Sequence, residues 1–327
     1  MNNCFGKILR MTIFGASHAD SVGVVLEGVP IGLRLVAKDF TMDLNRRKPQ
    51  GVGETPRTEE DRPTIVGVDA LGSVVDGRVE ISFQNRNRRS ADYSSLRNHP
   101  RPSHADLTQR LKYGEEYNLA GGGIASGRMT VALVAAGVVA KRVLGDIEFS
   151  SRLVSVGRES NAELFDEIVA DARRAGDSVG GVVECRVAGV PACWGEPFFD
   201  SVESVISHLV FSIPGVKGVE FGDGFDAATK RGSERNDCII NALGETLTNN
   251  EGGINGGISN GNDIVVRVAI KPTPSIARGQ RSFDFERGEV TELSIGGRHD
   301  ACIARRAMVV VEAMVAYALA DLKLQNG

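Results

Sequence analysis

Two stretches of this sequence are apolar on almost every side of the helix that each would form. Within residues 126–144, the run 131–140 has no polar side chain, and residues 305–324 contain only two acidic side chains. A helix that is apolar all round needs cover on more than one side. The apolar run 129–140 is also well short of the roughly 20 residues needed to cross a bilayer. We therefore predict two helices inside the protein.

Short runs of alternating polar and apolar residues predict the strands around these helices. They are residues 23–28, 78–83, 181–187 and 263–270. A third, amphipathic helix is predicted over residues 162–175. Strands before and after the first buried helix, with the second helix closing the chain, predict an α+β fold in which sheets enclose a helical layer.

The domain organisation is read from the stretches between these elements. A Pro/Ser-rich linker and a block of like charge are both absent from the sequence, and the polar stretch 46–62 is interpreted as a long loop. We therefore predict one domain over residues 1–327.

The charge balance and the cysteines exclude several classes of protein. The 38 basic and 42 acidic residues give a net charge of −4, which argues against a protein that coats nucleic acid or an anionic membrane. Five cysteines without a C-x-x-C pair indicate neither a disulfide framework nor a zinc ribbon. The first residues have no apolar stretch typical of a signal peptide before Lys7. We expect a cytoplasmic protein.

Glycine is unusually frequent, with 39 residues of 327, and it clusters at 121–123 and within 252–261. The first cluster leads into the predicted helix, so free backbone N–H groups and the positive helix end would face one spot beside Ser126 and Arg128. This pattern predicts an anion site, although tight packing would explain three glycines almost as well. The G-x-G-x-x-G and Walker patterns do not occur.

Three of the five histidines lie in similar short polar segments, at His18, His104 and His299. Ser103 followed three residues later by Asp106 is a helix-start pattern, so Ser103 is predicted to cap a helix over 105–113 with His104 in its first turn. Histidine can transfer protons near neutral pH or bind a metal. Taken alone, such a segment is as easily a simple helix cap.

Guanidinium groups gather locally although the chain is acidic overall. They lie in 45–49, 86–89 and 305–306 and at single positions between, and their planar forks suit phosphate and carboxylate. A small polyanionic ligand explains them better than nucleic acid does, although a solvated loop would explain 86–89 equally well. The strand exit 271–275 and the glycine-rich loop 249–261 could both approach a flat ligand, and neither is specific alone.

In chain order, these segments resemble the chorismate synthase family over nearly the whole length. The motifs that carry the resemblance are Phe14-Gly15-x-Ser17-His18, Asp43-Leu44-x-Arg46-Arg47, Thr55-Pro56-Arg57, Arg89-Ser90-x-Asp92-Tyr93-Ser94, Arg101-Pro102-Ser103-His104-Ala105-Asp106, Lys112-Tyr113-Gly114, Gly121-Gly122-Gly123, residues 212–220, Gly252-Gly253, Gly256-Gly257-Ile258-Ser259, Lys271-Pro272-Thr273 and Gly297-Arg298-His299-Asp300.

This resemblance implies a carbon–oxygen lyase of the shikimate pathway, which serves aromatic amino acid biosynthesis. The family converts 5-enolpyruvylshikimate 3-phosphate to chorismate and inorganic phosphate by an anti-1,4-elimination that needs reduced FMN (FMNH2) without net redox change. It further implies two sheets around a central helical layer, a homotetramer, an association with NADP, and neither a nucleic-acid nor a membrane partner. Because a separate nucleotide-binding fingerprint is absent from the sequence, we expect a separate flavin reductase.

The resemblance also assigns roles to residues. His18 would be the acid that assists departure of phosphate, His104 would lie beside the flavin, and Asp300 would accept a proton near flavin N5. Substrate-binding positions would be Ser17, Arg47, Arg101, Arg128 and Arg298. FMN-binding positions would be Ala125, Ser126, Pro214, Gly215, Gly256, Lys271, Pro272, Thr273, Pro274, Ser275 and Arg298.

The sequence departs from the usual family motifs at Ala16, Ala19, Ala120, Ile124 and Ala301. These changes leave open a paralogue that binds flavin or another ligand without turnover. A metal-dependent hydrolase built on the His/Asp segments is a second alternative, although metal-ligand spacing such as H-E-x-x-H does not occur.

Overall fold

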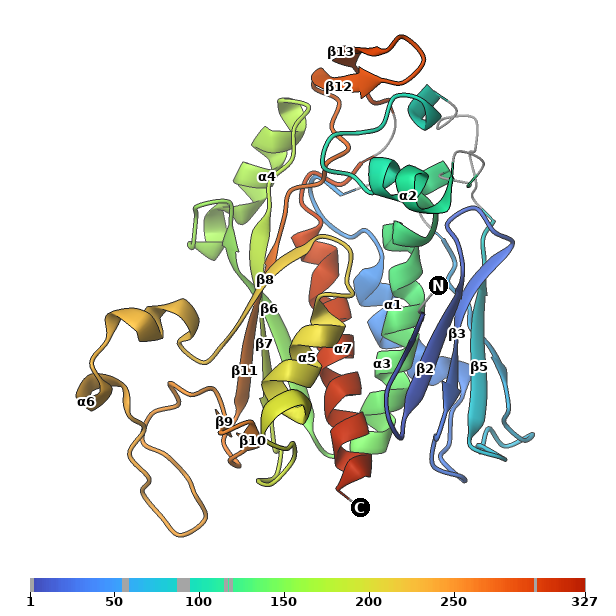
Figure 1. Cartoon of the computed structure of the whole chain (residues 1–327). Coiled ribbons are helices and arrows are strands. Elements are labelled where there is room, and N and C mark those ends of the chain that lie inside the picture. Colours follow the sequence, from blue (N-terminus) through green and yellow to red (C-terminus); the bar gives the residue numbers. More distant parts are fainter. Residues whose placement is uncertain are drawn as a thin grey trace.

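Two antiparallel sheets enclose a layer of helices in the computed structural model, which describes residues 3–54, 59–86, 95–114, 117, 120–296 and 299–326 (Figure 1). The first sheet has the order β1 (Cys4–Phe5), β2 (Arg10–Gly15), β3 (Ser21–Glu27), β5 (Arg78–Gln84) and β4 (Thr64–Val66). The second has the order β6 (Glu148–Val156), β7 (Gly181–Ala188), β11 (Ile264–Ile270) and β8 (Val216–Phe221). The predicted α+β sandwich is confirmed.

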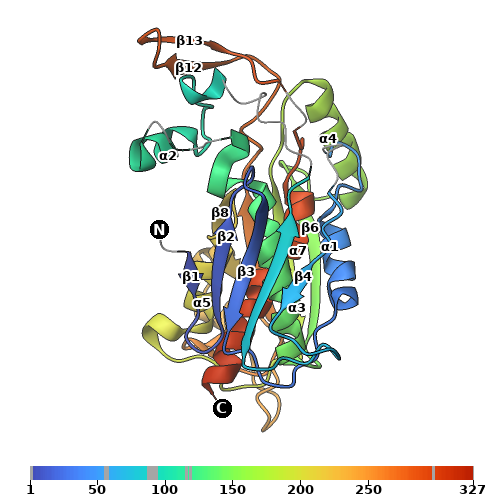
Figure 2. The same ribbon diagram turned by 90° about the vertical axis from the view of Figure 1, so that its right-hand side faces the viewer.

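The centre of the layer is formed by α3 (Thr130–Leu144) and α7 (Ala304–Gln325), with α1 (Thr41–Arg47) and α5 (Val202–Val210) beside them. Helix α3 packs on β3 and β5, α7 packs on β6 and β7, and the two helices pack on each other. Figure 2 shows the first sheet in front of both helices. Both helices have sheet on one side and helix on the other, which is why their sequences are apolar all round.

Helices α3 and α7 approach most closely at a glycine. A β-carbon on Gly137 would lie 2.3 Å from the β-carbon of Ala313, so only glycine fits this crossing. The stretch Ala120–Leu144 is long and apolar enough to cross a membrane by length and composition, yet 72% of its most apolar window is buried inside the protein. It serves as a core helix, as predicted.

The remaining elements lie around this sandwich. Helices α2 (Asp106–Tyr113) and α4 (Phe165–Arg174) and the hairpin β12 (Gln280–Asp284)–β13 (Glu289–Leu293) lie at the end where α3 and α7 begin (Figure 1). Helix α6 (Gly232–Arg235) and the hairpin β9 (Ile254–Asn255)–β10 (Ile258–Ser259) lie toward the other end. Short 3₁₀ turns cover Ala37–Phe40, Ser95–Arg97, Ala120–Ala125, Gly127–Met129, Ala162–Leu164, Phe198–Asp200 and Gly224–Thr229.

The four strands predicted from alternation correspond to β3, β5, β7 and β11, with ends shifted by two residues at most. The predicted amphipathic helix 162–175 is α4 with the 3₁₀ turn before it. The loop predicted over 46–62 was wrong at its start, because Arg46 and Arg47 form the last turn of α1. Arg46 is held there by ion pairs with Asp43 and Glu312, which a sequence pattern does not reveal.

Candidate active site

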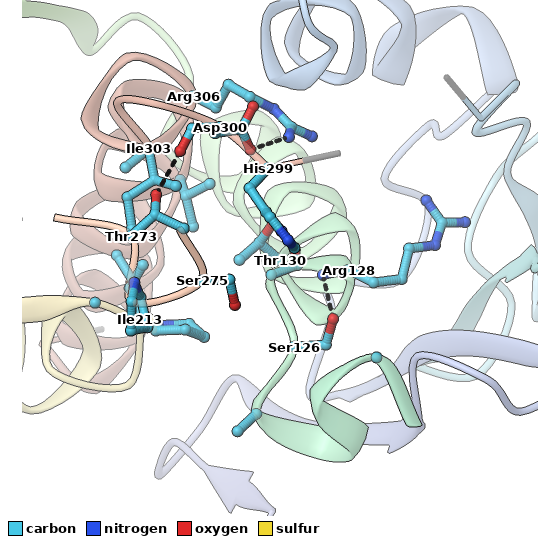
Figure 3. Close-up of a pocket in the computed structure, with 18 of the residues that line it drawn as sticks. Ser126, Arg128, Thr130, Ile213, Thr273, Ser275, His299, Asp300, Ile303 and Arg306 are labelled. Carbon is cyan, nitrogen blue, oxygen red and sulfur yellow. Dashed lines mark hydrogen bonds and ion pairs between the residues drawn. The ribbon is translucent and has the colours of Figure 1, made fainter. Parts of the chain in front are cut away.

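A cavity of about 440 Å³ opens where α3 and α7 begin, and its wall comes from segments far apart in the chain (Figure 3). Six described side chains in its lining are cationic and three are carboxylates. The cations are Arg47, Lys48, Arg101, Arg128, Lys271 and Arg306, and the carboxylates are Glu59, Asp61 and Asp300. This excess of positive charge suits a polyanionic ligand.

One wall of the cavity is a buried trio of Arg47, Asp61 and Arg128. Arg47 Nη2 lies 2.6 Å from Asp61 Oδ2, and Arg128 Nη1 pairs with Asp61 Oδ1. Arg128 Nε also donates to Asn85 Oδ1 at 2.8 Å. Burial alone would raise the pKa of Asp61, but the two guanidinium groups outweigh it and lower that pKa. Asp61 therefore holds the two arginines next to each other.

A second group joins Arg101 to α2. Arg101 donates from Nε to Asp106 Oδ2 and from Nη2 to Asp106 Oδ1, both at 2.7 Å, and from Nη1 to Ser275 Oγ at 3.0 Å. His104 Nδ1 lies 2.6 Å from Asp106 Oδ1. This contact is shorter than the 3.1 Å between Nδ1 and Arg101 Nη2, so it favours the proton on Nδ1 and directs Nε2 away from Asp106. Despite burial, Arg101 and His104 lower the pKa of Asp106.

The predicted capping role of Ser103 was wrong. The residue before α2 is Ala105, and it makes no side-chain cap, while Ser103 has a φ of 57°. The Asp106 carboxylate instead accepts from the backbone N–H of Arg101 at 3.1 Å. Because Arg101 and Asp106 tie this turn together, His104 precedes the helix instead of lying in its first turn.

The third group surrounds Asp300. Arg306 Nη1 donates to Asp300 Oδ2 at 2.8 Å, and Arg306 Nε donates to the carbonyl oxygen of Arg47 at 2.9 Å. The Thr273 hydroxyl donates to the backbone carbonyl of Asp300 at 2.7 Å, as Figure 3 shows. The neighbouring His299 also lines the cavity, and burial lowers its pKa.

The strand exit after β11 forms the opposite side. Lys271 Nζ donates to the carbonyl oxygen of Ser103 at 2.6 Å, and the Lys271 backbone N–H donates to the carbonyl of Gly215 at 2.9 Å. Burial, and then the charge of Lys217, lower the pKa of Lys271. Predicted FMN positions that line this cavity are Ala125, Ser126, Pro214, Gly215, Lys271, Thr273, Pro274 and Ser275.

Several predicted site residues are not in this lining. Pro272 does not line the cavity, and Gly256 lies in the β9–β10 turn, at the other end of the sandwich in Figure 1. Within one chain, the structure does not bring Gly256 to the other predicted FMN positions, because its hairpin and the exit of β11 lie at opposite ends of the second sheet. Arg298 lies outside the described residues, as do the motifs 55–57 and 89–94.

His18 and Ser17 lie behind the glycine segment. A β-carbon on Gly121 would lie 2.4 Å from His18 Cε1 and 2.7 Å from Ser17 Oγ. Gly121 lines the large cavity, whereas His18 lines a smaller one of about 200 Å³ with Ala16, Ala19, Tyr117, Ala120 and Gly123. His104 and Asp300 therefore line one cavity, and His18 lines a neighbouring one.

The glycine segment itself is fixed on both sides. All three glycines have positive φ, at 62°, 88° and 57°. The Gln109 amide donates to the carbonyl of Gly122 at 3.1 Å, and the Ser17 backbone N–H donates to that of Gly123 at 3.1 Å. Positive φ explains why glycine occupies these positions, and the segment separates the two cavities.

Five further lining residues had no assigned role from the sequence: Lys48, Asp61, Thr130, His299 and Arg306. His299 and Arg306 belong to segments that the sequence had already marked as polar or basic. Asp61 carried no signal, because its partners Arg47 and Arg128 lie 14 and 67 residues away.

The model of the chorismate synthase family matches residues 9–324. The chain belongs to the chorismate synthase family. It is 50% identical over 323 residues to a chorismate synthase of Chitinophaga pinensis, covering 98% of this chain and 96% of that protein. It is 40% identical over 361 residues to one of Methanobrevibacter smithii, covering 100% and 98%. A crystal structure of a chorismate synthase matches with a TM-score of 0.75 at 27% identity, covering 98% of this chain and 93% of that one.

Proposed function

We propose that this protein is an active chorismate synthase, which eliminates phosphate from 5-enolpyruvylshikimate 3-phosphate in an anti-1,4 sense and uses reduced FMN without net redox change. Family membership implies a lyase with a small-molecule substrate. The observation that carries the finer proposal is the single cavity in which Arg47, Arg101 and Arg128 lie with His104 and Asp300.

The substrate carries a phosphate and carboxylates, so its binding needs several fixed cations. Arg47, Arg101 and Arg128 are buried and held by carboxylates, which limits their rotamers before a ligand arrives. Preorganised guanidinium groups stabilise charge on a departing phosphate more than mobile ones do. We infer that these three residues bind the substrate and offset the charge that develops as phosphate leaves.

The cavity also suits a phosphorylated, largely flat cofactor. Its volume of about 440 Å³ is within the usual range for ligand sites. Arg47 Nε is buried and has no hydrogen-bond partner among the described residues, as expected of a donor meant for a ligand. The chemistry that bound reduced FMN supplies is an electron, lent to help expel phosphate and recovered afterwards.

The residues that would hold FMN are those of the cavity wall together with predicted positions outside it. In the wall they are Ala125, Ser126, Pro214, Gly215, Lys271, Thr273, Pro274 and Ser275. Pro272, Gly256 and Arg298 stay predictions from the family resemblance.

Three groups are proposed to handle protons. His104, oriented by Asp106 through Nδ1, offers Nε2 beside the flavin. Asp300, fixed by Arg306, accepts a proton from the flavin or substrate. His18 is proposed, from the family resemblance, as the acid for the departing phosphate. In this structure it lies against Gly121, which lines the large cavity.

The remaining proposals are one domain over residues 1–327, a cytoplasmic location and a separate flavin reductase, which rest on the sequence features described above, and a homotetramer, which rests on the family resemblance. Five large apolar side chains between residues 198 and 247 are more than 70% exposed, and their burial between copies would support the homotetramer. They are Phe198, Phe199, Phe225, Leu243 and Leu247.

Anaerobic turnover tests the proposed function. Protein mixed with photoreduced FMN and 5-enolpyruvylshikimate 3-phosphate should give chorismate and an equal amount of phosphate. Flavin binding without product would favour the paralogue, and absence of both binding and product would contradict the proposal.

A further inference from the structure

Asp61 is a carboxylate inside a cavity whose expected ligands are anions. Its side chain is only 1% exposed, and it accepts from both Arg47 and Arg128, two of the proposed substrate-binding residues. Asp61 therefore occupies donors that an anionic ligand would otherwise use. Because Asp61 reduces the positive charge available to an anionic ligand, its presence in this cavity needs a physical explanation.

The local backbone shows that Asp61 is held in place. Its φ is 49°, in the left-handed region that Asp tolerates better than most residues but still at some cost. Asn85 Oδ1 fixes Arg128 from the other side. Asp61 is thus constrained by its backbone and Arg128 by Asn85, and the Asp61 carboxylate keeps two like charges adjacent.

Asp61 does not use all the N–H donors of Arg47 and Arg128. Arg47 has Nε buried without a hydrogen-bond partner among the described residues, and its Nη1 reaches Thr130 Oγ1 only at 3.5 Å. Arg47 is also only 5% exposed. A buried charged donor of this kind is costly unless a ligand completes it. Arg47 therefore keeps N–H groups that an anionic ligand would satisfy.

We propose that Asp61 is a positioning residue that aligns Arg47 and Arg128 and offsets one of their two charges, so that phosphate is bound loosely enough to leave after the reaction. This inference rests on the proposed function and adds a residue to it. With Asp61 the trio has a net charge of +1, and without its carboxylate the charge is +2. The extra charge would hold phosphate more tightly and slow its departure.

Titration of the intact protein with inorganic phosphate tests the inference. Asp61→Asn keeps the size of the side chain and should tighten the dissociation constant for phosphate by about ten-fold, since a unit charge a few ångströms away is worth at least that much. Turnover should fall while phosphate becomes a stronger product inhibitor. Asp61→Glu restores the charge and should return phosphate affinity toward that of the unmodified protein.

Asp43→Asn is the matched control. Asp43 is also a buried carboxylate between two cations, Arg46 and Lys141, but it is not part of the cavity lining. Its substitution should lower stability and leave phosphate affinity unchanged. Equal phosphate affinity in Asp61→Asn and the unmodified protein would overturn the inference and leave the proposed function standing. If the unmodified protein binds no phosphate, the inference fails, whereas the proposed function is decided separately by anaerobic turnover.

A charge-balanced comparison covers the case in which Asp61→Asn does not fold. Arg47→Gln leaves the trio with a net charge of 0, and Arg47→Gln with Asp61→Asn returns it to +1, as in the unmodified protein. The double variant should bind phosphate about ten-fold more tightly than Arg47→Gln alone. Equal affinities of these two variants would overturn the inference.

Discussion

Arg306 and Asp300 form an ion pair on the cavity wall, with Arg306 Nη1 2.8 Å from Asp300 Oδ2. Arg306 also donates to the backbone of Arg47, so one side chain connects the start of α7 with the end of α1. Arg306 therefore both orients Asp300 and holds the backbone of Arg47, a member of the buried trio of Arg47, Asp61 and Arg128.

Replacing Arg306 should therefore impair catalysis more than flavin binding. Arg306→Gln is expected to lower kcat by about ten- to hundred-fold, the range seen when an orienting partner is lost. Stopped assays of chorismate and flavin fluorescence titration measure the two effects. Arg305→Gln, which removes the adjacent pair with Asp166, is the control and should keep kcat. Equal losses in both variants would contradict the positioning role.

His18→Ala should lower turnover by about 10²- to 10⁴-fold, the usual loss for a general acid, and should preserve flavin binding. Single-turnover assays with photoreduced FMN separate these effects. His208→Ala, whose ring packs 4.8 Å from that of Phe5, is the control and should keep turnover. Unchanged turnover in His18→Ala would remove this residue from the mechanism.

Gly121→Ala should displace His18, because the new β-carbon would lie 2.4 Å from His18 Cε1. Its φ of 62° adds strain of about 1 kcal/mol or more. Gly145→Ala is a matched control, because it has a φ of 79° and no described atom within 4 Å of the added carbon. We expect both to lose stability in urea unfolding and only Gly121→Ala to lose most of its turnover.

Asp106→Asn should lower the free energy of unfolding at pH 7 by about 3 kcal/mol, because the buried Arg101 loses its partner. The folded pKa of Asp106 lies below its unfolded value of about 3.9. The stability that the ionised Asp106 contributes is therefore fully present above about pH 3.9, and it is lost as pH falls through the folded pKa. Urea unfolding at pH 7 and pH 3 should show that the difference in free energy of unfolding between the unmodified protein and Asp106→Asn is smaller at pH 3. A difference independent of pH would contradict this.

Patterns along the chain predicted the layers of the fold well. Residues 131–140 had to be buried on several sides, and alternation marked β3, β5, β7 and β11, because both signals depend on local periodicity. The glycine cluster and the helix start also placed Ser126 and Arg128 at one site, and both residues line the cavity, since these segments are contiguous in sequence. That this site binds an anion stays a prediction.

Pairings between distant residues could not be predicted in this way. Asp61 joins Arg47 to Arg128 only after the sheets have packed, and Ser103 fails as a cap because Asp106 is recruited by Arg101. Gly256 has a suitable sequence but lies in a hairpin distant from the cavity. The roles of Asp61, Ser103 and Gly256 depend on which distant residues the fold brings beside them, and local sequence patterns do not contain that information.

The crossing of α3 and α7 at Gly137 and Ala313 has a consequence for a region it does not touch. Thr130 at the start of α3 and Arg306 and Ala307 at the start of α7 all line the cavity. The spacing of the two helices at Gly137 and Ala313 therefore constrains where these lining residues lie. The absent side chain at Gly137, deep in the interior, thus helps to set the geometry of a cavity that lies at the far end of the two helices.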